Sequence, residues 1–491
     1  MELLNGNTSL TRAKTGTKAE FLCTDLDGTI FVCDSLWESA LQLINLHFWY
    51  LFLMPLWLIQ GRAILKNEIA RRVQPDISKL PQRQDLIDFL RQEKLDGRKL
   101  ILATGADRRI ATAVAEHLGF FDEVLASDGV NNLIGERKRD AILATVSGKG
   151  FDYIGNGRED VPIWKAANCA FLVDPSAGLL KTVSQVGNVG GVFERRRSRW
   201  ASVWQSLRPQ HWVKNLLVFV PIVMAHELSQ RNRFSEVILA FLSFCFCASA
   251  VYILNDLFDL HADRLHPKKK FRPFASGEVA VWVGAGLVPL LLGFGISIGV
   301  LTSSRIFLGM LGTYIIVTTV YSLYAKRVPI LDVLLLTALY LLRILAGGAA
   351  ADVPVSPWLL AFSMFLMLSL AFTKRNAELI SHLTSPELGS TVSKRNYHIQ
   401  DREVIQQFGV TSGYLSVLVL ALYINGRDVT RLYRHPELIW LACPMLLFWI
   451  SRIWFLANRG RMSEDPVVFA ARDPLSYVLG VFLVLILVLA S

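Results

Sequence analysis

Apolar and polar positions follow different patterns in the two halves of this chain. Beyond about residue 210 the sequence consists mostly of long apolar runs separated by short charged loops. Before residue 200, shorter apolar segments alternate with charged ones, as in buried strands and amphipathic helices. The pattern predicts two domains in different solvents: an N-terminal α/β domain and a C-terminal all-α membrane domain.

Nine apolar runs in the second half approach the length of about 20 residues that crosses a bilayer, although the first and the last are short. They lie near residues 212–226, 236–254, 280–300, 304–323, 329–348, 357–373, 409–426, 437–457 and 474–490. The loops after the even-numbered runs carry most of the Lys and Arg residues, which predicts that they are cytoplasmic. Residues 1–20 have no apolar core of the signal-peptide kind, so we expect the first domain on the same side of a multi-pass inner-membrane protein.

Composition agrees with this division and adds a partner class. Hydrophobic residues make up 52% of the 491 residues, and the formal net charge is +10. Because much of the excess charge lies beside apolar runs, anionic lipid head groups or phosphorylated substrates explain it better than nucleic acid. The six cysteines show no metal-binding spacing, which favours reduced structural thiols.

Two segments of the first half place polar groups at the ends of predicted strands. AEFLCTDLDGTI is a short buried strand followed by an acidic loop, and LDGRKLILATGADRR is a strand that ends in a hydroxyl. With LIGERK and FDYIGNGRED, they occur in the order of the four motifs of the haloacid dehalogenase-like (HAD) superfamily, which residues 19–175 resemble. The resemblance implies a Rossmann-like phosphatase domain.

The HAD resemblance also implies roles for individual residues. Asp25 would attack a phosphoryl group, and Asp27 would protonate the leaving alcohol and then activate water. Thr104 and Lys138 would hold phosphoryl oxygens, and Mg²⁺ would be held by Asp25, Asp27, Asn156 and Asp160. Asn156 departs from the family pattern, which has Asp at this position, and this departure puts phosphatase activity in question.

A helical cap is expected between the first two motifs, at about residues 31–97. Its apolar run at residues 41–59 is interrupted by polar residues, and spanning would separate two parts of one catalytic domain. We therefore predict an interfacial or re-entrant helix pair on the membrane, with an ordinary buried cap helix as the alternative. The basic residues expected to face lipid head groups are Arg62, Lys66, Arg71 and Arg72.

The resulting domain boundaries are a flexible tail at 1–18, the HAD-like domain at 19–180, a linker with a basic surface segment at 181–207, and the membrane domain at 208–491.

Directly after the second apolar run, NDLFDLHADRLHPKKKFRP joins an acidic cluster to a basic one. A helix would gather Asn255, Asp256, Asp259 and Asp263 on one broad face, because their spacings are three, four, seven and eight residues. Carboxylates at a membrane edge need compensation, which a divalent cation carrying a diphosphate would supply. The basic residues that follow can bind the remaining phosphates, so the stretch predicts a magnesium diphosphate site.

This stretch, NDxxDxxxD, resembles the first aspartate-rich motif of the UbiA-type membrane prenyltransferase superfamily, over residues 205–491. LRPQHWVKNLLVF, DRLHPKKKFRPFASGEV and YSLYAKRVPILDVLLLTALYLLRILAGG are similar to the decaprenyl-phosphate phosphoribosyltransferase branch. That resemblance implies phosphoribosyl diphosphate as the donor, polyprenyl phosphate as the acceptor, and Mg²⁺ bound by Asn255, Asp256, Asp259 and Asp263. The candidate substrate-binding residues are Lys214, Asn215, Arg264, His266, Lys269, Arg272, Tyr321, Lys326, Asp332 and Arg343.

The two resemblances together suggest one reaction sequence. Transfer would leave a lipid that still carries a ribose 5-phosphate, which the HAD-like domain would remove. Two alternatives stay open: a prenyltransferase acting on an aromatic or alcohol acceptor, and a membrane scaffold or transporter with a regulatory HAD-like domain. A homo-oligomeric state is also left open.

Overall fold

The computed structural model describes residues 18–194, 198–383, 396–426, 429–462 and 465–490. The predicted flexible tail, except Lys18, lies outside this range, as does Arg195–Arg197 of the predicted basic segment. The chain forms two compact units. The first unit comprises Met1–Ser206 and Asp256–Gly286, and the second comprises Leu207–Asn255 and Leu287–Ser491.

A six-stranded sheet is the centre of the first unit. Its strands are β1 (Phe21–Thr24), β2 (Lys99–Asp107), β3 (Glu123–Ser127), β4 (Phe151–Gly155), β5 (Ala170–Val173) and β6 (Val189–Phe193). The order is β3-β2-β1-β4-β5-β6, and every pairing is parallel. In this doubly wound order the direction of winding changes between β1 and β4, and ligands bind beyond the carboxyl ends of the strands there.

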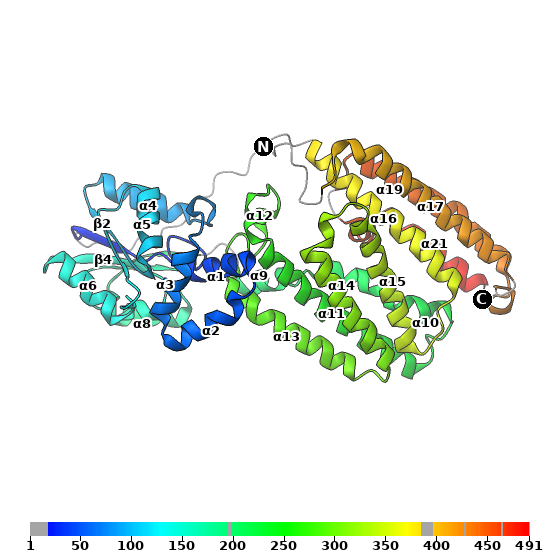
Figure 1. The fold of residues 1–491 in the computed structure, drawn as a ribbon, viewed down its shortest axis with the longest axis horizontal. Coiled ribbons are helices and arrows are strands. Elements are labelled where there is room, and N and C mark those ends of the chain that lie inside the picture. The colour runs from blue at the N-terminus through cyan, green and yellow to red at the C-terminus, as the bar shows by residue number, and fades with distance from the viewer. Residues whose placement is uncertain (1–17, 195–197, 384–395, 427–428, 463–464, 491) are drawn as a thin grey trace. The chain divides into compact units, whose positions relative to one another are not determined.

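Helices cover both faces of the sheet, because successive strand residues point to opposite faces. Leu22 packs on the side of α4 (Gln84–Leu95) and α5 (Arg108–Leu118). Its neighbour Cys23 packs on the side of α6 (Glu136–Val146), α7 (Val161–Trp164) and α8 (Ala177–Val186). Figure 1 shows these two layers around the sheet. The predicted α/β architecture agrees with this arrangement.

The α/β unit extends further than its predicted end at residue 180. Residues 189–193, which we predicted to be linker, form β6, the last strand of the sheet. The small polar composition of this stretch concealed the strand, because an edge strand needs few large side chains. α9 (Arg199–Ser206) follows.

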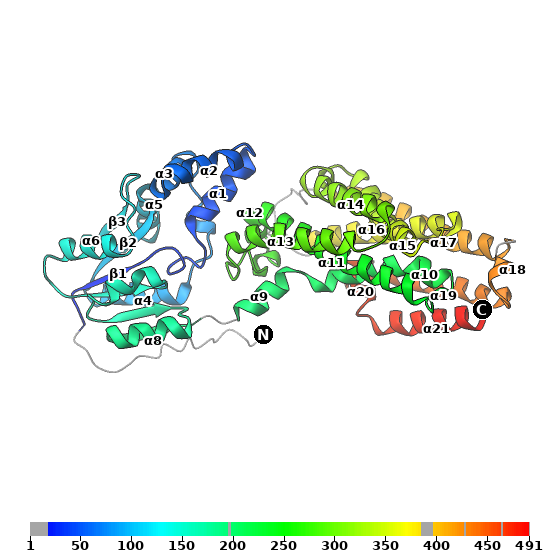
Figure 2. The ribbon, with the colours of Figure 1, turned by 90° about the horizontal axis from the view of Figure 1, so that it is seen from below.

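Three helices form an insertion between β1 and β2. They are α1 (Ser35–Leu46), α2 (Tyr50–Gln60) and α3 (Arg62–Arg72), drawn consecutively in Figure 2. This cap is shorter than predicted, because α4 belongs to the layer over the sheet. α2 contains no buried residue, and Trp49, Phe52 and Ile59 are exposed.

Seven of the nine predicted spans are helices long and apolar enough to cross a membrane. Within the described residues these are α11 (Arg231–Phe258), α13 (Val281–Val300), α14 (Arg305–Leu323), α15 (Leu331–Ala351), α16 (Pro357–Leu383), α17 (Arg402–Ile424) and α19 (Ala442–Asn458), the last two extended by short 3-10 turns. The predicted span at 212–226 is instead the 3-10 helix η3 (Pro209–Phe219) followed by α10 (Val220–Met224). The predicted last span is α21 (Pro474–Ala490), which is apolar but shorter.

Small residues allow close helix packing in the second unit. A Cβ at Gly409 of α17 would lie 2.1 Å from the Trp454 ring, and one at Gly413 would lie 2.6 Å from Ile450. Small residues at helix contacts are typical of membrane bundles, where van der Waals packing drives association.

Candidate functional site

The acidic loop after β1 lies at the switch point of the sheet. The Asp25 N–H donates to the Ile154 carbonyl of β4 at 2.9 Å, which ties this loop to the neighbouring strand. One Asp25 carboxylate oxygen accepts from the Leu26 N–H at 2.8 Å. Asp27 accepts from the N–H and the Oγ of Ser35 at 2.8 and 3.0 Å, so its position depends on the start of α1.

Lys138 connects the Asp25 loop to the loop after β4. Its Nζ lies 3.1 Å from an oxygen of Asp25 and 3.5 Å from one of Asp160. Tyr153 also donates to Asp160, at 2.8 Å. The sequence analysis did not identify Tyr153, because nothing separates a buried core tyrosine from a functional one by pattern alone. The predicted trio Asp25, Lys138 and Asp160 is therefore brought together.

Asp160 braces the turn that carries Asn156. One Asp160 oxygen accepts from the N–H groups of Asn156 and Gly157, each at 3.1 Å. The Asn156 amide packs over Gly28, which has φ +71°, and a Cβ at Gly28 would lie 2.0 Å from the Asn156 Nδ2. Glycine is required at this position both for its backbone conformation and for the approach of Asn156.

Thr104 reaches the same edge of the sheet but turns its hydroxyl inward. The side chain is fully buried, and its Oγ1 accepts from the Ala106 N–H at 3.1 Å. The Thr104 hydroxyl therefore stabilises the backbone at the end of β2, and it is not exposed to a phosphate.

Burial controls the protonation of the acidic loop. Desolvation raises the pKa of Asp25 despite the nearby Lys138 ammonium. Desolvation, with the nearby Asp34 carboxylate, raises the pKa of Asp27 to about 8. Burial disfavours the charge of Lys138, but Asp25 and Asp160 outweigh it and raise its pKa. Asp25 therefore has a cationic partner, whereas Asp27 is held as a proton donor at neutral pH.

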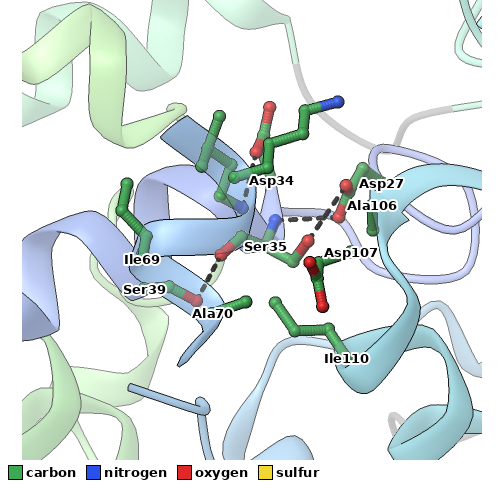
Figure 3. A pocket seen from close by; sticks show the side chains of 11 residues that line it. Asp27, Asp34, Ser35, Ser39, Ile69, Ala70, Ala106, Asp107 and Ile110 are labelled. Carbon is green, nitrogen blue, oxygen red and sulfur yellow. Dashed lines mark hydrogen bonds between the residues drawn. The ribbon is translucent and has the colours of Figure 1, made fainter. Parts of the chain in front are cut away.

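A cavity of about 60 Å³ lies between the cap and the sheet, beside Asp27. Figure 3 shows Ser35 between Asp27 and Ser39 in its wall, with Asp34 and Asp107 nearby. Lys66 of α3 also lines it, and its Nζ donates to the Gly105 carbonyl at 2.6 Å and to Asn132 at 2.9 Å. The prediction that Lys66 faces lipid head groups is therefore wrong, because the cap turns its side chain toward the acidic loop.

Arg72 is exposed on α3. It pairs with Glu68 and lies over the rings of Trp57 and Tyr50, at 4.7 and 5.7 Å. Arg62 and Arg71 are exposed, as predicted for residues on the outer surface.

The aspartate-rich motif does not form the continuous helical face that its spacing predicts. α11 ends at Phe258, the chain is interrupted at Asp259, and α12 (Leu260–Leu265) follows. One Arg272 nitrogen lies 3.1 Å from an Asp256 oxygen and 2.5 Å from an Asp263 oxygen. Asp256 and Asp263 nevertheless converge on one cation, as their shared helical face predicts, and burial raises the pKa of Asp263 although Arg272 opposes this.

Two predicted phosphate ligands in this segment bind protein groups instead. Arg264 pairs with Glu38 of the cap through two nitrogens, at 2.6 and 3.0 Å. The Nδ1 of His266 accepts from the N–H groups of Lys268 and Lys269, at 3.2 and 3.3 Å, and so shapes the turn that carries Lys269. The structure therefore places the Arg264 guanidinium in an ion pair with the cap.

In the second unit, Lys214 belongs to a buried charge cluster. Lys214 and Lys374 donate to one oxygen of Asp465, at 2.6 and 3.0 Å. Burial alone would raise the pKa of Asp465, but the two lysines outweigh it and hold this pKa well below its usual range. The sequence analysis did not identify Asp465, which is 251 residues from Lys214.

Four more predicted residues lie in this unit close to polar partners. Arg343 donates to the Asn215 Oδ1 at 2.9 Å and to the Tyr314 hydroxyl at 3.0 Å. Lys326 donates to the Asn255 Oδ1 at 3.3 Å. Asn255 and Lys326 are thus brought together at the end of α11, and Asn215 and Arg343 are brought together in the bundle.

Asp332 and Tyr321 belong to a different network. Asp332 is fully buried, with Arg375 Nε 2.5 Å away and the Tyr397 hydroxyl donating at 2.6 Å. Arg375 also donates to the Tyr321 hydroxyl at 3.0 Å. The structure therefore places Asp332 in an internal ion pair with Arg375.

We expect Asp332→Asn to destabilise the bundle rather than weaken substrate binding. Removing one partner of a buried ion pair costs about 3 to 5 kcal/mol, because the other charge stays buried. Thermal unfolding in detergent measures the loss, and Asp352→Asn at the exposed end of the same helix is the matched control. A raised KM at unchanged melting temperature would contradict this assignment.

The oxygen donors at both acidic sites fit Mg²⁺. Among the described residues, no three His, Cys, Asp or Glu side chains lie close enough together to hold a metal ion. Mg²⁺ sites, however, commonly use one or two carboxylates together with substrate phosphates and water. Asp256 and Asp263 already share one cationic partner, and Asp25 lies beside the Lys138 ammonium, so both sites offer carboxylate oxygens next to positive charge.

Comparisons with known proteins place the chain in a family. The UbiA prenyltransferase family matches residues 216–379. The uncharacterized protein y4nM of Sinorhizobium fredii is 33% identical over 476 residues, 96% of this chain and 91% of that protein. The decaprenyl-phosphate phosphoribosyltransferase of Mycolicibacterium smegmatis is 36% identical over 284 residues, 56% of this chain and 87% of that protein. A solved UbiA homolog from Archaeoglobus fulgidus, bound to GPP and Mg²⁺, covers 60% of this chain and 99% of its own, with 16% identity and a TM-score of 0.46.

The Sinorhizobium and Mycolicibacterium relatives are each more than 30% identical to this chain and are matched over most of their length. Together with the family match, this shows that the chain belongs to the UbiA prenyltransferase family. It is a membrane protein with homologues named decaprenyl-phosphate phosphoribosyltransferase. The match to y4nM spans both units, so the N-terminal α/β sequence also accompanies the UbiA-type sequence in that relative.

Proposed function

We propose that this chain transfers 5-phosphoribose from phosphoribosyl diphosphate to a polyprenyl phosphate, and that its N-terminal unit then removes the 5-phosphate. The observation that carries the proposal is the 36% identity to a decaprenyl-phosphate phosphoribosyltransferase over 87% of that protein. The product of the two steps would be polyprenyl-phosphoryl ribose. The active sites would lie at the cytoplasmic face of the inner membrane.

In the transfer step, the bond between the anomeric carbon and the diphosphate oxygen breaks as an oxygen of the lipid phosphate bonds to that carbon. Asp256 and Asp263, with Asn255 and Asp259, would bind Mg²⁺, which when bound supplies charge neutralisation for the departing diphosphate. The lipid phosphate is already anionic, so the step needs no strong general base. Catalysis would rest on positioning and on electrostatic stabilisation.

Basic side chains on the membrane half would bind the phosphates that the metal does not reach. The two positive charges of Lys214 and Lys374 face the single negative charge of Asp465. The remaining positive charge suits an incoming phosphate. Lys269, Arg272 and Lys326 are further candidates near the aspartate-rich motif.

In the hydrolysis step, Asp25 would attack the 5-phosphate and form an aspartyl phosphate while the ribose oxygen leaves. Asp27 would donate a proton to that oxygen, and it would then take one from the water that attacks the aspartyl phosphate. Lys138, 3.1 Å from Asp25, would bind the transferring oxygens. The polar cavity beside Asp27, lined by Ser35, Ser39 and Lys66, is suited to a hydroxylated sugar phosphate. These contacts support the HAD-like assignment of the first unit.

We further propose that α2 inserts into the bilayer surface and holds the hydrolase site close to the lipid product. α2 is 11 residues long and apolar, too short to span, with no buried residue. An apolar helix of this kind gains free energy by lying in the interfacial region.

A nitroxide spin label attached to Ile59→Cys should therefore be more accessible to lipid-soluble oxygen than to a water-soluble nickel complex. Leu95→Cys on α4 is the matched control, since the two side chains are 83% and 81% exposed, and it should show the reverse. Electron paramagnetic resonance in liposomes, with Cys169 replaced by Ser, measures both. Equal nickel access at the two sites would contradict insertion.

The family name favours a second candidate, transfer of a prenyl group from prenyl diphosphate to an aromatic or alcohol acceptor. Ribose-labelled phosphoribosyl diphosphate and labelled prenyl diphosphate distinguish the two. We expect lipid-soluble label from the ribose donor when polyprenyl phosphate is present, and none from the prenyl donor. Label from the prenyl donor alone would overturn the proposal.

A further inference from the structure

A buried ion pair joins the cap to the acidic segment, defined as residues 256–286. Arg264 of α12 donates from two nitrogens to the two carboxylate oxygens of Glu38 in α1. Its Nε donates to the Ala275 carbonyl at 3.1 Å, and this additional hydrogen bond fixes the orientation of the guanidinium. The Arg264 and Glu38 side chains are only 7% and 6% exposed. Such a bidentate pair fixes orientation as well as distance.

Further contacts extend this junction along the acidic segment. The Asn45 amide of α1 donates to the Phe258 carbonyl at 3.4 Å. Gly277, with φ +78°, packs so closely that a Cβ there would lie 3.1 Å from the Val32 side chain. Ser202 of α9 donates to Glu278 at 2.8 Å. The segment is therefore packed, at several points along its length, against the N-terminal part of the first unit, residues 18–206.

The ion pair also lies between the two acidic sites. On α1, Glu38 is one turn after Ser35, whose N–H and hydroxyl hold Asp27. On α12, Arg264 directly follows Asp263, which shares Arg272 with Asp256. A short path of helix and hydrogen bonds thus runs from the hydrolase acid to the transferase acids.

We propose that Glu38 and Arg264 are positioning residues. Through them the N-terminal α/β part of the first unit, residues 18–206, becomes a structural part of the transferase site. The cap helix holds α12 so that Asp256 and Asp263 face one cation. The N-terminal unit is then required for transfer even when its own hydrolase chemistry is disabled. This inference rests on the proposed transfer reaction for its kinetic test.

The test uses full-length protein carrying Asp25→Asn, so that hydrolysis does not obscure transfer. Glu38→Gln and Arg264→Gln should each raise the KM for phosphoribosyl diphosphate and the Mg²⁺ concentration needed for half-maximal rate by about tenfold. The charge-swapped double variant, Glu38→Arg with Arg264→Glu, should bring both the KM and the half-maximal Mg²⁺ concentration a substantial part of the way back to the parent values. Glu93→Gln is the matched control, because it breaks another buried ion pair of the same unit, with Arg98. It should lower thermal stability without changing either constant.

Hydrogen exchange distinguishes failure of this inference from failure of the proposed reaction. Glu38→Gln should increase exchange both in α1 and in residues 259–275, and the charge-swapped double variant should reverse this. If the parent protein transfers no phosphoribose, the proposed function fails. The hydrogen-exchange result still shows whether the Glu38–Arg264 pair orders residues 259–275. Unchanged exchange in residues 259–275, or identical kinetic effects of Glu38→Gln and Glu93→Gln, would overturn the positioning role.

Discussion

Asp256→Asn is expected to abolish consumption of phosphoribosyl diphosphate while the protein stays folded. The substitution removes the charge of a buried side chain that, with Asp263, faces a single cationic partner. A neutral amide binds Mg²⁺ weakly, so the diphosphate would leave without charge neutralisation. We expect the transfer rate to fall about 100-fold or more, which corresponds to about 3 kcal/mol of transition-state stabilisation.

The matched control for Asp256→Asn is Glu236→Gln at the opposite end of the same helix, where the carboxylate binds Ser303. Its transfer rate should be close to that of the wild type. Mg²⁺-dependent release of diphosphate, measured on purified protein in nanodiscs, checks both variants. Full activity of Asp256→Asn would remove the aspartate-rich motif from the reaction.

Asp25→Asn is expected to leave transfer intact and to stop the pathway at the 5-phosphorylated lipid. An amide is a poor nucleophile, so the aspartyl phosphate cannot form and hydrolysis should fall about 1000-fold or more. Removing the Asp25 charge also leaves Lys138 with Asp160 as its remaining carboxylate neighbour at this site. Mass spectrometry of the lipid products should therefore show accumulation of the phosphorylated species.

Asp140→Asn, an exposed carboxylate on α6 that pairs with Arg139, is the control for Asp25→Asn. It should yield the same dephosphorylated lipid as the wild type. If wild type and Asp25→Asn accumulate the 5-phosphorylated lipid equally, the N-terminal unit is not the phosphatase in this sequence of reactions.

The sequence predicted those features that depend on local pattern. Seven apolar runs became helices of spanning length, because hydropathy over about 20 residues is a local property. Asp25, Lys138 and Asp160 were found together because strand ends of a parallel sheet meet at one edge. The order of the motifs was therefore enough to predict that these three residues lie near one another.

Long-range pairing could not be predicted in the same way. Glu38 and Arg264 are 226 residues apart, and Asp332 and Tyr397 are 65 apart. Basic residues near a membrane were interpreted as phosphate ligands, yet a buried guanidinium such as that of Arg375 needs an internal carboxylate. Which partner a charge finds depends on tertiary packing, and this is why the sequence did not predict the partners of Arg264 and Asp332.

Short or broken elements formed the other group of errors. The run at 212–226 is apolar enough for a span, but it folds as a 3-10 helix followed by the short α10. The break at Asp259 places Asp256 and Asp263 on two helices, α11 and α12, where the spacing predicted one continuous helix. The sequence marks the first interruption with Pro221 in the first turn of α10, whereas neither proline nor glycine lies at the break at Asp259.

The most direct test of the account is the mass of the lipid formed by wild-type protein from phosphoribosyl diphosphate, polyprenyl phosphate and Mg²⁺. The account predicts a lipid heavier than the acceptor by one ribosyl group, formed through an intermediate that carries one additional phosphate. A prenylated acceptor from a prenyl diphosphate donor, with no ribosylated lipid under any condition, would contradict it.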